Sequence, residues 1–113
     1  MAFMRVKLIP QKDLKKAWTL ECVYVERSPF SDFRNLYNSF SGLFIVAYDH
    51  TELIGTCVGH IDERGIIIDA IAVDYKYWRR GTGSNMLKFF EKRTKLTGAC
   101  ALSVGSARGY IRN

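Results

Sequence analysis

One segment constrains the fold more than any other: a run of apolar, mostly β-branched residues that leads through a glycine-containing turn into an amphipathic helix. It spans residues 66–87 and has the sequence IIIDAIAVDYKYWRRGTGSNML. The run 66–73 is almost entirely apolar, which is typical of a strand buried on both faces of a sheet. From Gly83 to about Leu96 the apolar residues recur on one helical face. A buried strand that leads into such a helix predicts a layered domain, with the helix packed on the sheet.

The remaining residues supply the other elements of that domain. Hydrophobic periodicity and turn residues predict two helices, over 11–25 and from the Ser28-Pro29 pair to Gly42. They also predict strands over 3–9, 43–48, 53–60 and 99–104. The predicted order is β-α-α-β-β-β-α-β, an α+β or mixed α/β fold. With 113 residues, the chain is expected to form one domain, 1–113.

Four aromatic residues of the second helix recur at helical spacing: Phe30, Phe33, Tyr37 and Phe40. Such a stripe either belongs to the core or lines a substrate pocket, and the core is the more common case.

Composition excludes several classes of protein. The chain is 48% hydrophobic, which is too apolar for a disordered protein. Its apolar runs are far shorter than the roughly 18 residues of a membrane span, and we expect no signal peptide. The three cysteines, Cys22, Cys57 and Cys100, are far apart and form no CxxC pair. We therefore expect a cytoplasmic protein without disulfides or a metal site, with Cys57 and Cys100 as small core residues.

The net charge of +6 comes from one segment. Residues 76–95 contain seven Lys and Arg residues and one Glu, while the rest of the chain has ten basic and ten acidic residues. A basic stripe of this kind indicates a phosphate-bearing ligand, a nucleic acid or simply a solvated helix face.

The turn within the stripe favours the phosphate-bearing ligand. Glycines at the start of a helix let backbone N–H groups approach an anion, and Arg79 and Arg80 supply charge. The sequence contains neither GxxxxGK[ST] nor GxGxxG.

Residues 71–87, IAVDYKYWRRGTGSNML, resemble the coenzyme A-binding motif of the GCN5-related N-acetyltransferases, the GNAT superfamily. The matching positions are Tyr77, Arg79, Arg80, Gly81, Gly83 and Leu87. The predicted element order also matches that family. The resemblance implies a GNAT-like fold and the transfer of an acetyl group from acetyl-CoA to a primary amine of a small molecule or peptide, without a metal.

The resemblance also assigns roles to individual residues. Backbone groups of Ile71 and Val73 would pair with the pantetheine arm, and the Val73 N–H would stabilise the oxyanion. Amides of residues 80–84 would hold the pyrophosphate. This set comprises Arg80, Gly81, Thr82, Gly83 and Ser84.

The general base is expected among two residues. Asp69 interrupts an apolar strand, and period-2 alternation puts it on the same face as Ile71 and Val73, so it is either the base or substrate anchor, or a structural hydrogen-bond partner. His60, at the end of the preceding strand, is the alternative base, although a lone histidine is more often a surface or core residue. Asp74 is expected to cap the turn after the strand.

The sequence departs from the family pattern in two places. Trp78 stands where Gln or Arg is usual, so Arg79 or Arg80 would replace that pyrophosphate contact. Relatives usually continue with a helix whose tyrosine protonates the departing thiolate, whereas this chain ends at Asn113. Tyr110 is then the nearest candidate for that role. The chain would then be naturally short, truncated or completed by a second subunit, with a homodimer through an exposed sheet edge as one arrangement.

Two other functions remain as alternatives. The first is a CoA-binding or interaction module without turnover. The second, nucleic-acid binding, is disfavoured because the basic stripe coincides with the phosphate-binding turn.

Overall fold

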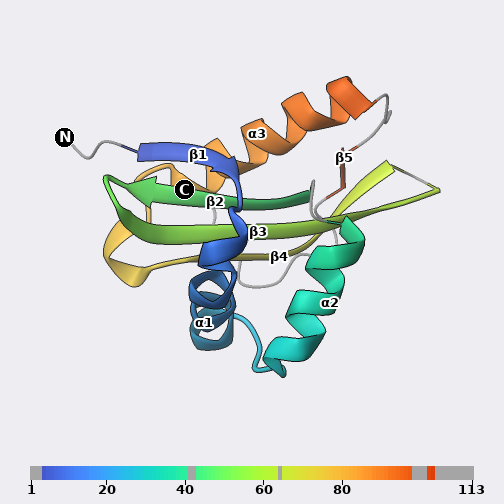
Figure 1. Cartoon of the computed structure of the whole chain (residues 1–113). Helices are drawn as coiled ribbons and strands as arrows, with labels where there is room; N and C mark the ends of the chain where they lie inside the picture. The colour runs from blue at the N-terminus through green and yellow to red at the C-terminus, as the bar shows by residue number, and fades with distance from the viewer. Residues whose placement is uncertain (1–3, 41–42, 64, 98–101, 104–113) are drawn as a thin grey trace.

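A five-stranded sheet with helices on both faces forms the fold (Figure 1). The computed structural model describes residues 4–40, 43–63, 65–97 and 102–103. The strands lie in the order β1-β2-β3-β4-β5. The pairs from β1 to β4 are antiparallel, and β5 is parallel to β4. Their bounds are β1 Met4–Leu8, β2 Phe44–Asp49, β3 Glu52–Asp62, β4 Gly65–Val73 and β5 Leu102–Ser103.

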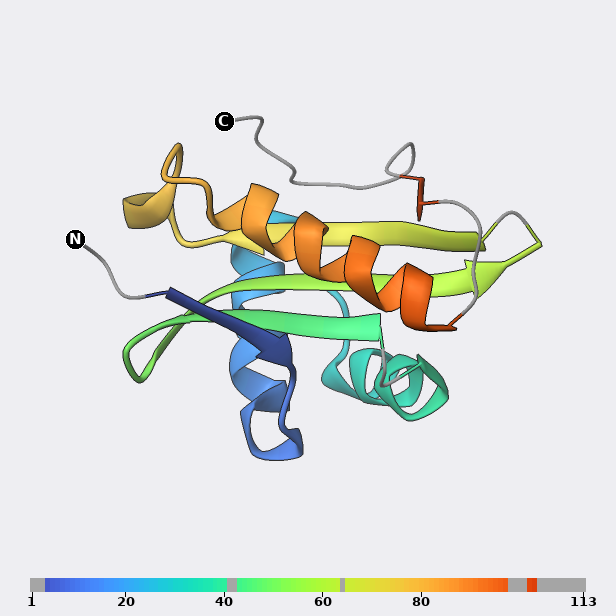
Figure 2. The same ribbon diagram turned by 90° about the horizontal axis from the view of Figure 1, so that it is seen from above.

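The helices divide between the two faces of the sheet (Figure 2). One face carries α1 Leu14–Tyr24 and α2 Phe30–Phe40, and the other carries α3 Thr82–Thr97. Two short 3-10 turns, η1 Gln11–Asp13 and η3 Tyr75–Tyr77, precede α1 and α3. The predicted α+β class and element order are confirmed. The first predicted helix begins as η1, and of the predicted strand 99–104 only β5 is described.

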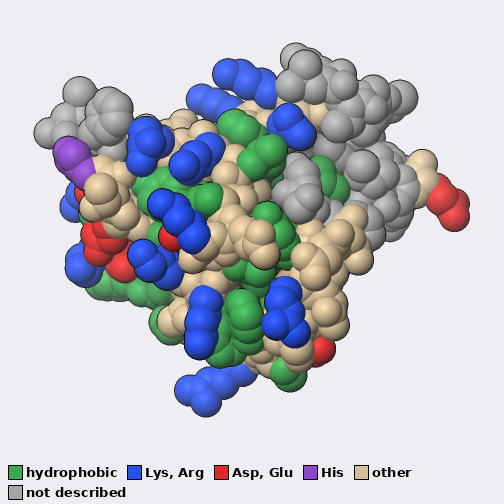
Figure 3. Space-filling model, in the orientation of Figure 1, with side chains coloured by type: hydrophobic (Ala, Val, Ile, Leu, Met, Phe, Trp, Pro, Cys, Tyr) green, Lys and Arg blue, Asp and Glu red, His purple; other side chains and the backbone are tan. Residues whose placement is uncertain are grey.

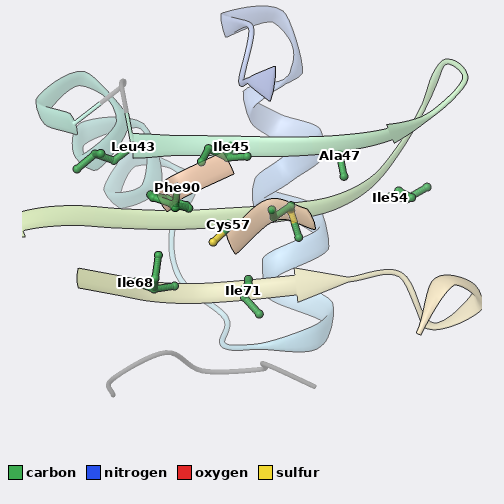
Figure 4. Packing of buried hydrophobic residues seen from close by; sticks show 9 residues of the cluster. Leu43, Ile45, Ala47, Ile54, Cys57, Ile68, Ile71 and Phe90 are labelled. Carbon is green, nitrogen blue, oxygen red and sulfur yellow. The ribbon is translucent and has the colours of Figure 1, made fainter. Parts of the chain in front are cut away.

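Each face of the sheet has its own hydrophobic core. On the α3 side, buried residues of β2, β3 and β4 surround Met86 and Phe90 (Figure 4). On the other side, α1 and α2 pack against residues such as Phe44 and Val58. Phe33 is buried there, its ring 5.2 Å from that of Phe44, and Phe30 and Tyr37 pack against the same core. The core interpretation is confirmed for these three residues, whereas the side chain of Phe40 lies outside what the structure describes.

Small residues on β3 let α3 pack closely. A Cβ on Gly59 would lie 2.6 Å from the backbone oxygen of Ile67 and 3.2 Å from the Phe90 ring. A Cβ on Gly55 would lie 3.1 Å from the end of Met86 and 3.3 Å from the methyl group of Thr82. Since Gly55 pairs with Val73, this packing brings the start of α3 beside the end of β4.

A β-bulge in β4 corrects one prediction. Ala70 pairs with Val58 and Ile68 with Gly59, so Asp69 is an extra residue without a partner on β3. The bulge interrupts the period-2 alternation. Ile71 therefore packs toward α3, whereas Asp69 lies with Ala70 on the α1 and α2 face. The prediction that Asp69 shares a face with Ile71 and Val73 was wrong, because a regular pleat was assumed.

Candidate functional site

The start of α3 forms an anion cradle from residues 80–84. The first backbone bond of the helix joins the Asn85 amide to the Gly81 carbonyl (2.9 Å), so the amides of Thr82, Gly83 and Ser84 have no acceptor within the helix. Gly81 has a positive φ of 82°, and the space where its Cβ would lie is empty to 4 Å. The Thr82 hydroxyl is buried, with no hydrogen-bond partner among the described residues. A cradle of free amides at a positive helix end suits a phosphate group.

The turn before the cradle is held in place by polar contacts. The Asp74 carboxylate accepts a hydrogen bond from the Lys76 amide (3.0 Å), which confirms the predicted cap. The Tyr77 hydroxyl donates to Asp49 on β2 at 2.5 Å, and this bond is the main cause that raises the pKa of Tyr77 to about 12. The exposed Arg80 lies over the Tyr77 ring, 5.8 Å from its centroid. The cradle is thus tied to the β2–β3 hairpin.

The outer side of β4 presents backbone groups to an open edge, which we define as the N–H and C=O groups of Ile71 and Val73. The Asp74 amide donates to the Ile54 carbonyl (2.8 Å), so Val73 and its partner Gly55 exchange no hydrogen bonds with each other. The backbone groups of Val73, and of Ile71 two residues earlier, therefore point away from β3. Among the described residues, β5 pairs with β4 only at 66 and 67.

Trp78 occupies part of this open edge. Its indole N–H donates to the Val73 carbonyl at 2.7 Å. The Val73 N–H keeps its outward direction, and among the described residues no hydrogen bond to it is found.

Aromatic contacts attach the end of α1 to the same place. The Tyr24 hydroxyl accepts a hydrogen bond from the Tyr75 amide (2.9 Å), and its ring lies 6.0 Å from that of Trp78. The Tyr75 and Trp78 rings are 5.1 Å apart. The carboxyl ends of α1 and β4 are therefore fixed relative to each other.

The two predicted base candidates are in contact. Asp69 Oδ2 lies 2.6 Å from His60 Nδ1, and about a third of each side chain is exposed. His60 lies within β3 rather than at its end. Asp69 therefore has a hydrogen-bond partner in His60, and it also lines a cavity.

That cavity, which we call the carboxylate cavity, has a volume of about 330 Å³ and lies on the face of the sheet opposite α3. Its carboxylates come from α1, the residue pair after α1, and β4. The lining residues are Glu21, Val25, Glu26, Leu36, Val58, Asp69 and Ala70. Burial, and secondarily the charge of Asp69, raises the pKa of Glu21 from 4.5 to about 7. No hydrogen bond or ion pair joins the Glu21 side chain to another described residue.

Glu21→Gln is expected to stabilise the protein at high pH and to have little effect at low pH. Between pH 4.5 and about 7, the folded chain keeps a proton that the unfolded chain has lost, so wild-type stability falls as pH rises through this window. Glutamine removes this loss. Allowing for partial solvent exposure, we expect a gain of about 1–2 kcal/mol at about pH 8. Thermal unfolding at about pH 5 and pH 8 measures it, and an equal difference at both values would contradict the raised pKa.

Other predicted features fall outside this region. Cys57 is completely buried, and burial raises the pKa of its thiol, so it is a core residue. Tyr110 and Cys100 lie outside the described residues. Within the described ranges, no three potential metal ligands cluster and no helix is long and apolar enough to cross a membrane.

Basic side chains also gather over β1 and the start of α1 (Figure 3). Arg5, Lys7, Lys12 and Lys16 line a hollow there, around the Tyr48 hydroxyl and its hydrogen-bond partner Asp13. This second basic surface is separate from the segment 76–95 that the sequence singled out.

The sequence analysis missed Glu21 and Tyr24. Glu21 follows the buried Leu14 by seven residues and the buried Ala17 by four, so it lies on the apolar face of α1. A carboxylate at that position was the available signal. The contact of Tyr24 with Tyr75, 51 residues away, has no local signal.

Comparisons with known proteins agree on the fold. Residues 8–109 match the profile of the Acetyltransferase (GNAT) family, and no curated protein matches the sequence. Ard1 from Thermoplasma volcanium superimposes with a TM-score of 0.79 at 19% identity, covering 88% of this chain and 68% of that one. The ribosomal-protein-S18-alanine N-acetyltransferase from Escherichia coli gives 0.72 at 16% identity, covering 88% and 64%. A GNAT family acetyltransferase from Brucella melitensis, in complex with acetyl-CoA, gives 0.72 at 12% identity, covering 93% and 77%.

Proposed function

We propose, from the premise that this chain belongs to the Acetyltransferase (GNAT) family, that it transfers an acetyl group from acetyl-CoA to a primary amine by direct attack in a ternary complex. The observation that carries the proposal is that the anion cradle and the open edge lie together at the end of β4, with the carboxylate cavity a few residues earlier on the same strand, at Asp69 and Ala70. The acceptor is an amine of a small molecule or a peptide. The Escherichia coli relative, by its name, acts on an alanine of a ribosomal protein.

The cradle fits the pyrophosphate of coenzyme A. The amides of residues 80–84 donate to its oxygens, and Arg79 or Arg80 adds positive charge in place of the side chain lost at Trp78. The unpartnered Thr82 hydroxyl supplies one more hydrogen-bond donor beside the amides. The empty space at Gly81 keeps the approach clear.

The open edge fits the pantetheine arm. Backbone groups of Ile71 and the N–H of Val73 bind it as an added strand would be bound. When bound, acetyl-CoA supplies the thioester as acetyl donor. The Val73 N–H donates to the thioester carbonyl and stabilises the negative charge that develops on its oxygen.

An alkylamine, with a pKa near 10.4, must lose a proton before it can attack. Asp69 lines the carboxylate cavity and is hydrogen-bonded to His60, so this pair is suited to anchor the acceptor amine or to relay the proton that the amine loses.

A second candidate function is CoA binding without turnover. The bond from Trp78 to the Val73 carbonyl favours it, because one backbone group of the open edge is already occupied. Turnover of an amine by a chain that binds acetyl-CoA distinguishes the two functions.

Replacing Arg79 and Arg80 together with alanine is expected to weaken acetyl-CoA binding by about tenfold or more, because two cations leave the pyrophosphate site. Isothermal titration of acetyl-CoA into the wild-type chain and the double variant measures this. The control is Lys92→Ala with Lys88→Ala, which removes two exposed charges from the helix that follows. Unchanged affinity of the arginine variant would contradict our placement of the pyrophosphate.

A further inference from the structure

The carboxylate cavity is on the opposite side of the sheet from α3 and reaches β4 at the bulge. The bulge turns Asp69 and Ala70 toward this cavity, while Ile71 and Val73 keep their backbone groups on the open edge. An acyl group held along the open edge therefore has the cavity beside it. The rest of the lining is apolar, from Val25, Leu36 and Val58, which suits the carbon stem of an amine.

Contacts of Tyr24 fix the end of α1 that carries Glu21. Glu21 and Tyr24 are three residues apart and share a helix face. Tyr24 binds the Tyr75 amide and packs on Trp78, and Trp78 binds the Val73 carbonyl. The backbone of α1 therefore places Glu21 one turn before a residue that is held against the Val73 end of β4.

The other carboxylates are placed less favourably for the same task. Asp69 is already paired with His60 at 2.6 Å, and Glu26 is exposed at the rim. Glu21 is half-buried, and no other described residue pairs with its carboxyl group.

We infer, building on the proposed function, that Glu21 is the general base: it holds the ammonium form of the acceptor in the carboxylate cavity and takes the proton that the amine loses before attack. The acceptor class is a cationic primary amine on a short apolar stem.

The protons and electrons balance as follows. One ammonium proton passes to the Glu21 carboxylate and then to solvent. The nitrogen lone pair forms the C–N bond to the thioester carbon, and the C–S bond breaks with its electron pair on sulfur. The second proton lost by nitrogen goes to that sulfur, which gives an amide and free thiol.

The charges that face Glu21 set its protonation. Asp69 from β4 and Glu26 after α1 share its cavity, His60 from β3 pairs with Asp69, and α2 contributes the uncharged Leu36. The pKa of Glu21, about 7, differs less from the pKa of the amine than that of an ordinary glutamate does. Proton transfer from the ammonium group to Glu21 is therefore less uphill.

Amine binding tests the inference without turnover. The probe is n-butylamine, with n-butanol as its uncharged counterpart, and the readout is the NMR signal of the 13C-labelled Glu21 carboxyl group. We expect n-butylammonium to lower the pKa of Glu21, and to bind the Glu21→Gln variant about tenfold or more weakly than it binds wild type. We expect n-butanol neither to shift this pKa nor to distinguish the two proteins. Glu91→Gln, the same change at an exposed position on α3, is expected to bind like wild type. Equal binding by Glu21→Gln and wild type, or no response of the Glu21 signal, overturns the inference.

The pH dependence of acetyl transfer separates this inference from the proposed function. We expect Glu21→Gln to lose the limb of the kcat/KM profile near pH 7 while keeping its acetyl-CoA affinity. If the variant turns over with an unchanged profile, the reaction stands and Glu21 is not the base. If wild type neither binds acetyl-CoA nor acetylates any amine, the proposed function fails and the role of Glu21 as base fails with it. If such a protein still binds n-butylammonium, the cavity is an amine-binding site without catalysis.

Discussion

Gly81→Asp is expected to weaken acetyl-CoA binding by about 100-fold and to leave the fold intact. The Cβ position is free to 4 Å, and aspartate is among the residues that best tolerate a positive φ, here 82°. A carboxylate at the start of α3 interacts favourably with the helix dipole, so the two effects on stability oppose each other. The same carboxylate repels the pyrophosphate, and a loss of about 2.7 kcal/mol is reasonable for like charges a few ångströms apart near a protein surface. Isothermal titration gives the affinity, and thermal unfolding gives the stability.

Gly81→Asn is the matched control, since it has the same shape and tolerates the same backbone conformation without the charge. We expect its affinity to fall by less than about tenfold. Equal losses of affinity for the two variants would mean that the size of the new side chain, and not its charge, weakens binding. Full affinity in Gly81→Asp would mean that the cradle is not part of the acetyl-CoA site.

The sequence was informative about this part of the molecule because its determinants are local. The strand, the turn cap at Asp74 and the helix start are continuous in sequence, and each has a pattern that depends on neighbours a few residues away. The position of the cradle, residues 80–84, follows from that segment alone. The aromatic stripe of α2 was also interpretable, because core packing explains helical spacing without further information.

The carboxylate cavity and the open edge were predicted less well, because their geometry depends on residues that are distant in sequence. Asp69 was placed on the wrong face, since a bulge is set by the pairing of β4 with β3 and leaves no mark in the spacing of apolar residues. Trp78 departs from the family motif, and the motif alone does not predict that its indole N–H binds the Val73 carbonyl at the open edge. Glu21 acquires its environment only when α1 packs across β4, more than 40 residues away in sequence.

Gly59→Ala is expected to destabilise the protein by about 3 kcal/mol, which corresponds to a fall in Tm of about 10 °C or more. The new Cβ would lie 2.6 Å from the Ile67 carbonyl oxygen, a backbone atom held in the centre of the sheet. The Phe90 ring, 3.2 Å away on α3, closes the other side, so relief requires β4 or α3 to move. Thermal and urea unfolding measure the loss.

Gly55→Ala is the control, because it makes the same change on the same face of β3, four residues earlier. Its Cβ would meet the flexible end of Met86 at 3.1 Å, which can rotate away, and we expect a cost within about 1 kcal/mol. Gly59 also pairs with Ile68, next to the bulged Asp69, so a shift of β4 at this point would displace the carboxylate cavity. Gly59→Ala should therefore lose n-butylammonium binding together with stability, whereas Gly55→Ala should keep both; a Gly59→Ala protein as stable as wild type would contradict the close packing of β3 and β4 described above.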